Sequence, residues 1–273
     1  MPGSRARWRE SRIASFSAEW LALREPADAA ARSAALADAF ATRARRIVDL
    51  ACGTGANIRF LAPRLPRASD WLAVDNDARL LAALLSPEGA TVSTLQLDLA
   101  HALDELPLAG RDLVTASALL DLVSAPWLAR LAARCADAGS DVLFALTFDG
   151  RIEWSPGDEG DERVRELINR HQLRDKGFGA ALGPAAAAAA ESTFGALGYE
   201  VRTAPSHWTL GPESPALQAA LVDGWAAAAA EIAPGQDDAL RGWARRRRAL
   251  VAVGRSRLRV GHVDLAGSRS RSR

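Results

Sequence analysis

The sequence has few of the residues from which disulfide frameworks and metal sites are built. Its 273 residues include two cysteines, Cys52 and Cys135, and four histidines, and their spacing matches no metal-ligand pattern. Two cysteines cannot form a disulfide framework, which suits a reducing compartment. We therefore predict a cytoplasmic protein that holds no metal ion.

Long apolar runs and an excess of positive charge are also missing. The alanine-rich stretches 185–190 and 226–230 are much shorter than the roughly 20 apolar residues of a membrane span. The formal net charge is +1, and the arginine run 245–248 is typical of a solvated helix face. We therefore expect no membrane association, and the charge argues against a nucleic-acid substrate.

From Arg46 onward, short β-prone runs alternate with segments whose apolar residues have helical spacing. This alternation is typical of βαβ units and predicts an α/β protein with a doubly wound, Rossmann-like sheet. We expect seven mostly parallel strands with helices on both faces. The predicted strands are 46–50, 70–74, 91–97, 112–116, 141–147, 199–205 and 257–264.

The chain divides into three predicted parts. An N-terminal helical cap covers residues 1–45, with helices at 16–23 and 27–45 and Pro26 at the start of the second. The main domain covers 46–266. Within it we expect lid or substrate elements at about 149–183 and 206–252, the latter a helical insertion before the last strand. The arginine–serine tail 267–273 is predicted to be disordered.

The stretch "DLACGTGAN" contains the clearest candidate for a binding loop. Gly53 and Gly55 follow Asp49 at the end of the first predicted strand. Glycine is used where φ is positive or where a ligand meets bare backbone, and this edge of a parallel sheet binds ligands. A nucleoside triphosphate loop is excluded because the Gly-Lys-Ser/Thr ending is missing. A dinucleotide loop is disfavoured because Ile58 replaces its third glycine.

The loop and the acids after it resemble the class I S-adenosylmethionine-dependent methyltransferase family. That family's first motif, acid-x-Gly-x-Gly-x-Gly, corresponds to Asp49 through Gly55, with Ala51 at the first glycine. Asp75 ends the second predicted strand, and Asp98 ends the third. The segment "DLVTASALLDLV" resembles the fourth motif, which borders the methyl-transfer site in the family. The resemblance covers residues 47–148.

The resemblance implies S-adenosylmethionine as cofactor. It places Asp49 near the cofactor's ammonium group, Asp75 near the ribose, and Asp98 with Leu99 near the adenine. Capping of the following helices is the alternative role for Asp75 and Asp98. The expected cofactor-binding residues are Asp49, Ala51, Gly53, Gly55, Asn57, Asp75, Asn76, Asp98, Leu99 and Ser117. Arg24, Arg32 and Asn57 are all candidates to bind the cofactor's carboxylate.

We predict methyl transfer to an O, N or C atom of a small-molecule acceptor. Residues that could contact this acceptor follow the fifth predicted strand, and His207 follows the sixth. His171 and Asp175 are four apart on a predicted helix, so the carboxylate could orient the imidazole or raise its pKa, and we name them as catalytic candidates. A solvated helix with one ion pair is the alternative. The candidate substrate contacts are Trp154, Gln172, Lys176 and His207.

Two other functions stay open at this stage. One is an NAD(P)-dependent oxidoreductase, which Ile58 argues against. The other is a scaffold that binds the cofactor without catalysis. Methyl transfer requires no fixed catalytic side chain, so the sequence does not separate that scaffold from an enzyme.

Overall fold

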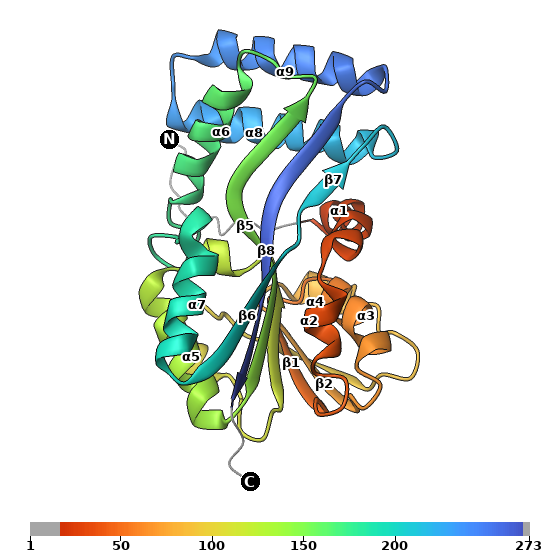
Figure 1. The fold of residues 1–273 in the computed structure, drawn as a ribbon, viewed down its shortest axis with the longest axis vertical. Helices are drawn as coiled ribbons and strands as arrows, with labels where there is room; N and C mark the ends of the chain where they lie inside the picture. The colour runs from red at the N-terminus through yellow and green to blue at the C-terminus, as the bar shows by residue number, and fades with distance from the viewer. Residues whose placement is uncertain (1–16, 270–273) are drawn as a thin grey trace, which may run out of the picture.

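The computed structural model describes residues 17–269 and places them around one eight-stranded sheet (Figure 1). The strand order is β3-β2-β1-β4-β5-β8-β6, and β7 pairs with β8. Neighbours from β3 to β5 are parallel, whereas β8 is antiparallel to β5, β6 and β7. The strands are β1 Arg46–Leu50, β2 Asp70–Asp75, β3 Val92–Gln96, β4 Leu113–Ser117, β5 Asp141–Ser155, β6 Tyr199–Pro205, β7 Trp208–Leu210 and β8 Arg257–Arg269.

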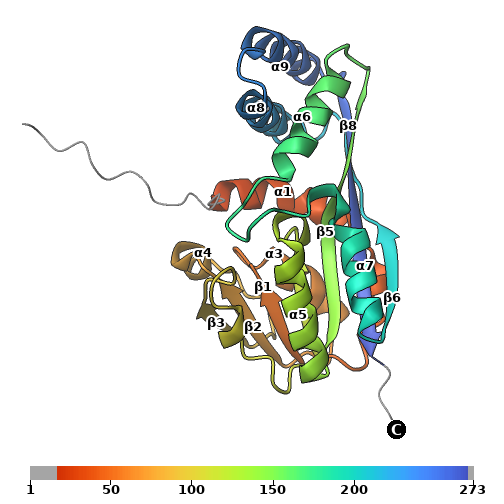
Figure 2. The ribbon, with the colours of Figure 1, turned by 90° about the vertical axis from the view of Figure 1, so that its left-hand side faces the viewer.

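This architecture confirms the predicted doubly wound, mostly parallel sheet. The eighth strand is β7, a three-residue strand within the segment predicted as a lid. Helices cover both faces of the sheet (Figure 2). On one face lie α2 (Ala34–Asp38), α3 (Ala56–Leu61) and α4 (Ala78–Ala82); on the other lie α5 (Ala125–Ala138) and α7 (Ala186–Ala196).

Strand alternation decides which face each residue of β1 meets. Val48 and Leu50 pack in the cluster that contains the apolar side of α5, while Ile47 packs against α2 and α3. Asp49 shares its face with Ile47, so its carboxyl points toward α3. The one polar residue of the strand interior is thereby placed beside the helix that follows the glycine loop.

A second layer stands on the carboxyl edge of the sheet. Strands β5 and β8 continue past their neighbours and pair as far as Ser155 and Arg257. Against them pack α6 (Asp161–Gln172), α8 (Pro215–Ile232) and α9 (Asp237–Ala252), as Figure 1 shows. We call these three helices with the two strand ends the helical cap, which is a different part of the chain from the predicted N-terminal cap. The predicted helical insertion before the last strand is confirmed.

The N-terminal helices differ from the prediction. A single helix, α1 (Ala18–Ala31), runs through Pro26, and α2 is only a short helix after it. Pro26 removes one hydrogen bond, but the helix continues because Trp20, Leu23 and Ala27 pack against the helical cap. The expected start of the first helix, Phe16, lies outside the described residues.

Two strands are longer than predicted. Residues 149–155, expected in the lid segment, belong to β5, and residues 152–155 pair with the amino end of β8 after a β-bulge or irregularity. Residues 267–269, assigned to the tail, extend β8 and pair with Tyr199, Glu200 and Val201 of β6. The rest of the predicted tail, 270–273, is not among the described residues. Within 17–269, no helix combines the length and apolar character needed to cross a membrane.

Candidate active site

The loop between β1 and α3 has a backbone that most side chains would disfavour. Ala51, Gly53 and Gly55 have φ angles of +49°, +54° and +86°, all in the left-handed region. A Cβ atom on Gly53 would lie 2.8 Å from Cδ1 of Leu21 in α1. Small residues are therefore required here both for the backbone conformation and for the close approach of a neighbour.

Ala51 occupies a glycine conformation at an energetic cost. We expect Ala51→Gly to raise the free energy of unfolding by up to about 1 kcal/mol, because glycine tolerates positive φ. Urea denaturation measures the change. The matched control is Ala129→Gly on the exposed side of α5, which should lower the free energy of unfolding by about 1 kcal/mol. A destabilised Ala51→Gly protein would contradict the expectation.

Asp49 and Asn57 form a buried polar pair beneath this loop. Asn57 Nδ2 donates to Asp49 Oδ1 at 2.5 Å and to Thr115 Oγ1 at 3.2 Å. Burial raises the pKa of Asp49 to about 7, opposed by Asn57 and by the charge of Arg32. Asp49 Oδ2 and Asn57 Oδ1 are buried and have no hydrogen-bond partner within the described residues. Two orphaned acceptors at one place are what a ligand carrying an ammonium group would satisfy.

The three candidates for binding the cofactor's carboxylate differ in how many contacts they already make within the protein. The Asn57 amide nitrogen is used by the pair above. Arg24 makes two hydrogen bonds to Asp28 and lies over the ring of Trp208. Arg32 is 8% exposed, stacks over Phe60, and has no ion pair within the described chain. Its Nε atom is buried without a partner.

Asp75 links the second strand to the glycine loop. Its Oδ2 accepts a hydrogen bond from the Gly53 N–H at 2.8 Å, and its Oδ1 accepts one from the Asp77 N–H at 2.9 Å. Burial raises the pKa of Asp75. The N-cap of α4 is Asp77, so helix capping is not the role of Asp75. Asn76, beside it, is exposed.

The third strand ends at Gln96, and Asp98 follows it with a half-exposed carboxylate. Its Oδ1 accepts from the Ala100 N–H, and its Oδ2 lies 2.9 Å from Nδ1 of His101. Leu99 is buried, and its carbonyl accepts from Trp127 Nε1. Ser117 ends β4 at the same edge of the sheet.

The predicted pairing of His171 with Asp175 on one helix face does not form. Helix α6 ends at Gln172, and Asp175 instead accepts hydrogen bonds from the N–H groups of Gly177 and Gly179. The partner of His171 is Lys176, whose Nζ lies 3.2 Å from its Nδ1. Burial and the Lys176 charge lower the pKa of His171, opposite to the predicted direction.

The other candidate substrate contacts lie in the cap and, for His207, in the connection between β6 and β7. Trp154 belongs to its core and meets Trp225 and Trp243 edge-on. His207 accepts from the His262 N–H and lies near Arg151, away from the His171–Lys176 pair. Gln172 ends α6 and is half-buried. The structure therefore brings together only His171 and Lys176 among these candidates.

Asp121 is a polar residue of the site that the sequence analysis missed. It lies in the short 3-10 helix η3 (Leu120–Leu122) after β4 and is 6% exposed. Its Oδ1 has no hydrogen-bond partner in the described part of the chain. Burial raises its pKa to about 6, opposed by two backbone N–H groups and by the charges of Arg24 and Lys176. The available signal was one acid inside the apolar run "ALLDLV".

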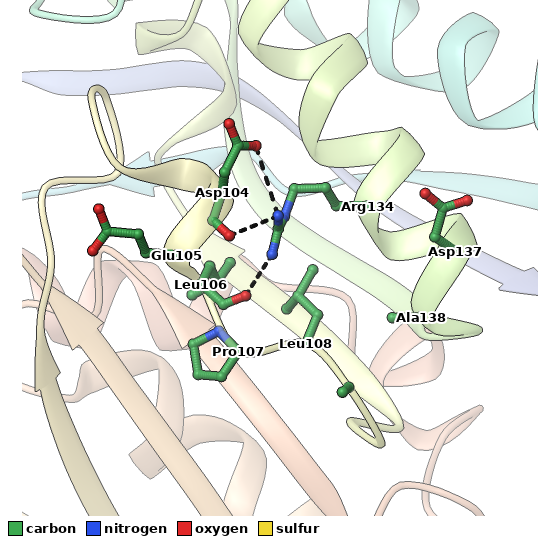
Figure 3. A pocket seen from close by; sticks show the side chains of 9 residues that line it. Asp104, Glu105, Leu106, Pro107, Leu108, Arg134, Asp137 and Ala138 are labelled. Atoms are coloured by element: carbon green, nitrogen blue, oxygen red, sulfur yellow. Dashed lines mark hydrogen bonds and ion pairs between the residues drawn. The ribbon is translucent and has the colours of Figure 1, made fainter.

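A separate surface hollow of about 510 Å³ lies away from this site. Figure 3 shows its lining between α5 and the segment that leads into the amino end of β4, opposite the glycine loop. Arg134 crosses it and donates to the carbonyl oxygens of Asp104 and Leu106. Among residues 17–269, no group of three or more His, Cys, Asp or Glu side chains could hold a metal.

Part of the chain matches a known protein family. Residues 47–139 match the family model described as a methyltransferase domain. No curated protein matches the chain. Cyclopropane synthase MmaA2 from Mycobacterium tuberculosis is similar in structure, with a TM-score of 0.45 and 12% identity over 94% of this chain and 87% of its own.

Two further solved structures are similar at the same level. Mycolic acid cyclopropane synthase CmaA1, complexed with SAH and CTAB, has a TM-score of 0.44 and 13% identity over 82% of this chain and 78% of its own. An O-methyltransferase family protein from Burkholderia thailandensis has a TM-score of 0.44 and 14% identity over 92% and 57%. The matched residues contain the glycine loop, Asp75 and the fourth motif, so this part of the chain is a methyltransferase domain.

Proposed function

We propose that this methyltransferase acts on a small organic molecule bound between the glycine loop and the helical cap. The observation that carries the proposal is that α1 and the segment after α6 cover the carboxyl edge of the sheet. There α1 and the segment after α6 place Arg24 and Lys176 near the buried Asp121. A covered site suits a small acceptor better than a long, polyanionic one.

The buried polar atoms around the glycine loop fit the cofactor's amino-acid part. Asp49 Oδ2 and Asn57 Oδ1 would accept hydrogen bonds from its ammonium group, and both lack partners among residues 17–269. Arg32 is the best candidate for its carboxylate because Arg24 and the Asn57 amide nitrogen are already engaged. The proposed site is completed by the roles that the family resemblance implies, Asp75 at the ribose and Asp98 with Leu99 at the adenine.

The bound cofactor supplies an electrophilic methyl group, and the protein's task is mainly alignment. The glycine loop holds one end of the cofactor against bare backbone, and Asp75 fixes that loop through the Gly53 N–H. Helix α1 covers the loop, with Leu21 next to Gly53, which excludes water from the site. The cap then orients the acceptor.

The cofactor site is tested by titration calorimetry with S-adenosylmethionine, S-adenosylhomocysteine and NADH. We expect Asp75→Ala to weaken binding of both sulfur nucleosides by about 10- to 100-fold, the usual worth of hydrogen bonds to a charged group. The matched control is Asp104→Ala, which removes an exposed acid near the opposite edge of the sheet and should change nothing. Binding of NADH alone would overturn the proposal.

The acceptor is tested by screening small hydroxyl, amine and carbon acids for release of S-adenosylhomocysteine. A methylated product from one of these classes supports the proposal and identifies the atom. Turnover only on nucleic acid or protein substrates would contradict it.

A further inference from the structure

Asp121 is a buried carboxyl group for which the cofactor-binding roles above have no use. Its side chain is 6% exposed, and its Oδ1 has no hydrogen-bond partner among residues 17–269. It also makes no ion pair within the part of the chain that the structure describes. A buried carboxyl oxygen without a partner is costly, so it marks a place where a ligand group can complete the site.

The order of the strands places Asp121 on the methyl side of the cofactor. Strand β1 lies between β2 and β4, and Leu50 is level with Val74 on one side and with Ala116 on the other. The proposed cofactor contacts run from β1 to β2 to β3, from amino acid to ribose to adenine. The acceptor must therefore approach from the opposite direction, over the end of β4, where Asp121 lies in η3.

Two cations face Asp121 from different elements without contacting it. Arg24 comes from α1, and Lys176 from the segment after α6. The Phe148 N–H of β5 also points to the carboxyl and favours its charged form. Lys176 is held by His171, whose Nε2 lies 3.4 Å from Glu231 of α8. The carboxylate thus has favourable charges around it and one oxygen free for an incoming N–H or O–H group.

We propose that Asp121 is the catalytic residue that receives the acceptor's proton, and that the acceptors carry an O–H or N–H group. The inference rests on the proposed function. The acceptor's lone pair forms the bond to the methyl carbon, and the carbon–sulfur bond breaks with its electron pair left on sulfur. The acceptor's proton passes to Asp121 Oδ1, so charge and atoms balance.

Sinefungin tests this proposal without a known acceptor. In sinefungin a carbon bearing an ammonium group replaces the sulfur and its methyl, so that the ammonium occupies the methyl position. We expect the wild-type protein to bind sinefungin about 10- to 100-fold more tightly than S-adenosylhomocysteine, since a charged hydrogen bond to Asp121 forms only with sinefungin. Asp121→Asn should abolish this preference and leave the affinity for S-adenosylhomocysteine within about twofold.

The same preference should depend on pH in the wild-type protein. The pKa of Asp121 is raised to about 6, so its carboxylate becomes protonated as the pH falls through that value. The charged groups facing it are Arg24 of α1 and Lys176 of the segment after α6. The ratio of the two affinities should therefore shrink toward one between about pH 7 and 5, while Asp49 affects both ligands equally and cancels from the ratio.

Each outcome of this experiment decides something. If S-adenosylhomocysteine does not bind the wild-type protein, the proposed function fails. If it binds but sinefungin is not preferred, or if Asp121→Asn keeps the preference, Asp121 does not face the methyl position and the inference fails. Circular dichroism checks that Asp121→Asn is folded. Asp121→Ser is a second substitution that should also abolish the preference, and the pH series on the wild-type protein needs no variant. Asp104→Asn is the control and should retain the preference.

Discussion

Replacing Arg247 by methionine is expected to lower the free energy of unfolding by about 3–5 kcal/mol. Arg247 is completely buried in the helical cap. Its guanidinium donates to both carboxylate oxygens of Asp161 and to the Pro156 carbonyl, and it lies over the ring of Trp154. Methionine keeps much of the volume but leaves the charge of Asp161 without its cation, and uncompensated buried charge is the main cost.

Urea denaturation of Arg247→Met measures this effect. Arg241→Met is the matched control on the same helix, because Arg241 is exposed and its ion pair with Asp238 is screened by water, so little change is expected. The double variant Arg247→Met with Asp161→Leu should recover much of the loss by removing the stranded charge. A single variant as stable as the control would show that the pair does not stabilise the cap.

The arginine run 245–248 illustrates what the sequence could not reveal. It was interpreted as a solvated helix face, and three of its members fit that interpretation. Arg245 is exposed, Arg246 pairs with Asp158, and Arg248 pairs with Asp223. Arg247 points inward because the helical period turns one residue of the run toward the core. The buried arginine is stabilised by Asp161, Pro156 and Trp154, which are all far away in the sequence.

The first four strands were predictable because they are local features. Each is a short apolar run bounded by turn residues, and the predicted bounds of β1 match the structure. Strands β5 and β8 exceeded the prediction because their outer halves are stabilised by each other. Residues 152–155 pair with residues more than a hundred positions later in the chain, which the local pattern of a polar, glycine-containing stretch does not reveal.

In the candidate site, too, some contacts were predictable from the sequence and others depended on distant parts of the chain. The juxtaposition of Asp49, Gly53 and Asp75 followed from strand ends meeting at one edge of a parallel sheet. The pairing of His171 with Asp175 failed because it depended on where α6 ends, and helix ends are set by the turn chemistry of residues such as Gly177 and Gly179. Asp121 was missed because its burial depends on α1, β5 and the segment after α6 meeting above it.

Replacing Asp49 by asparagine is expected to weaken S-adenosylhomocysteine binding by at least about 100-fold, because the ligand's ammonium group would lose its buried anionic partner. Burial raises the pKa of Asp49 from 3.8 to about 7. The unliganded folded protein therefore holds a proton that the unfolded chain releases between these values. Stability accordingly falls as the pH rises from about 4 to 7, and the penalty is fully present above pH 7.

Ligand binding reverses this preference, because the ammonium group favours the ionised carboxyl. The affinity of the wild-type protein should fall by up to about tenfold per pH unit below pH 7, and calorimetry in buffers of different ionisation enthalpy should detect proton release on binding. Asp49→Asn should lose this pH dependence. The control ligand is 5′-methylthioadenosine, which lacks the amino-acid part, so its affinity should be the same in both proteins. Equal weakening of both ligands would mean that the substitution disturbs the glycine loop instead of removing an ammonium partner.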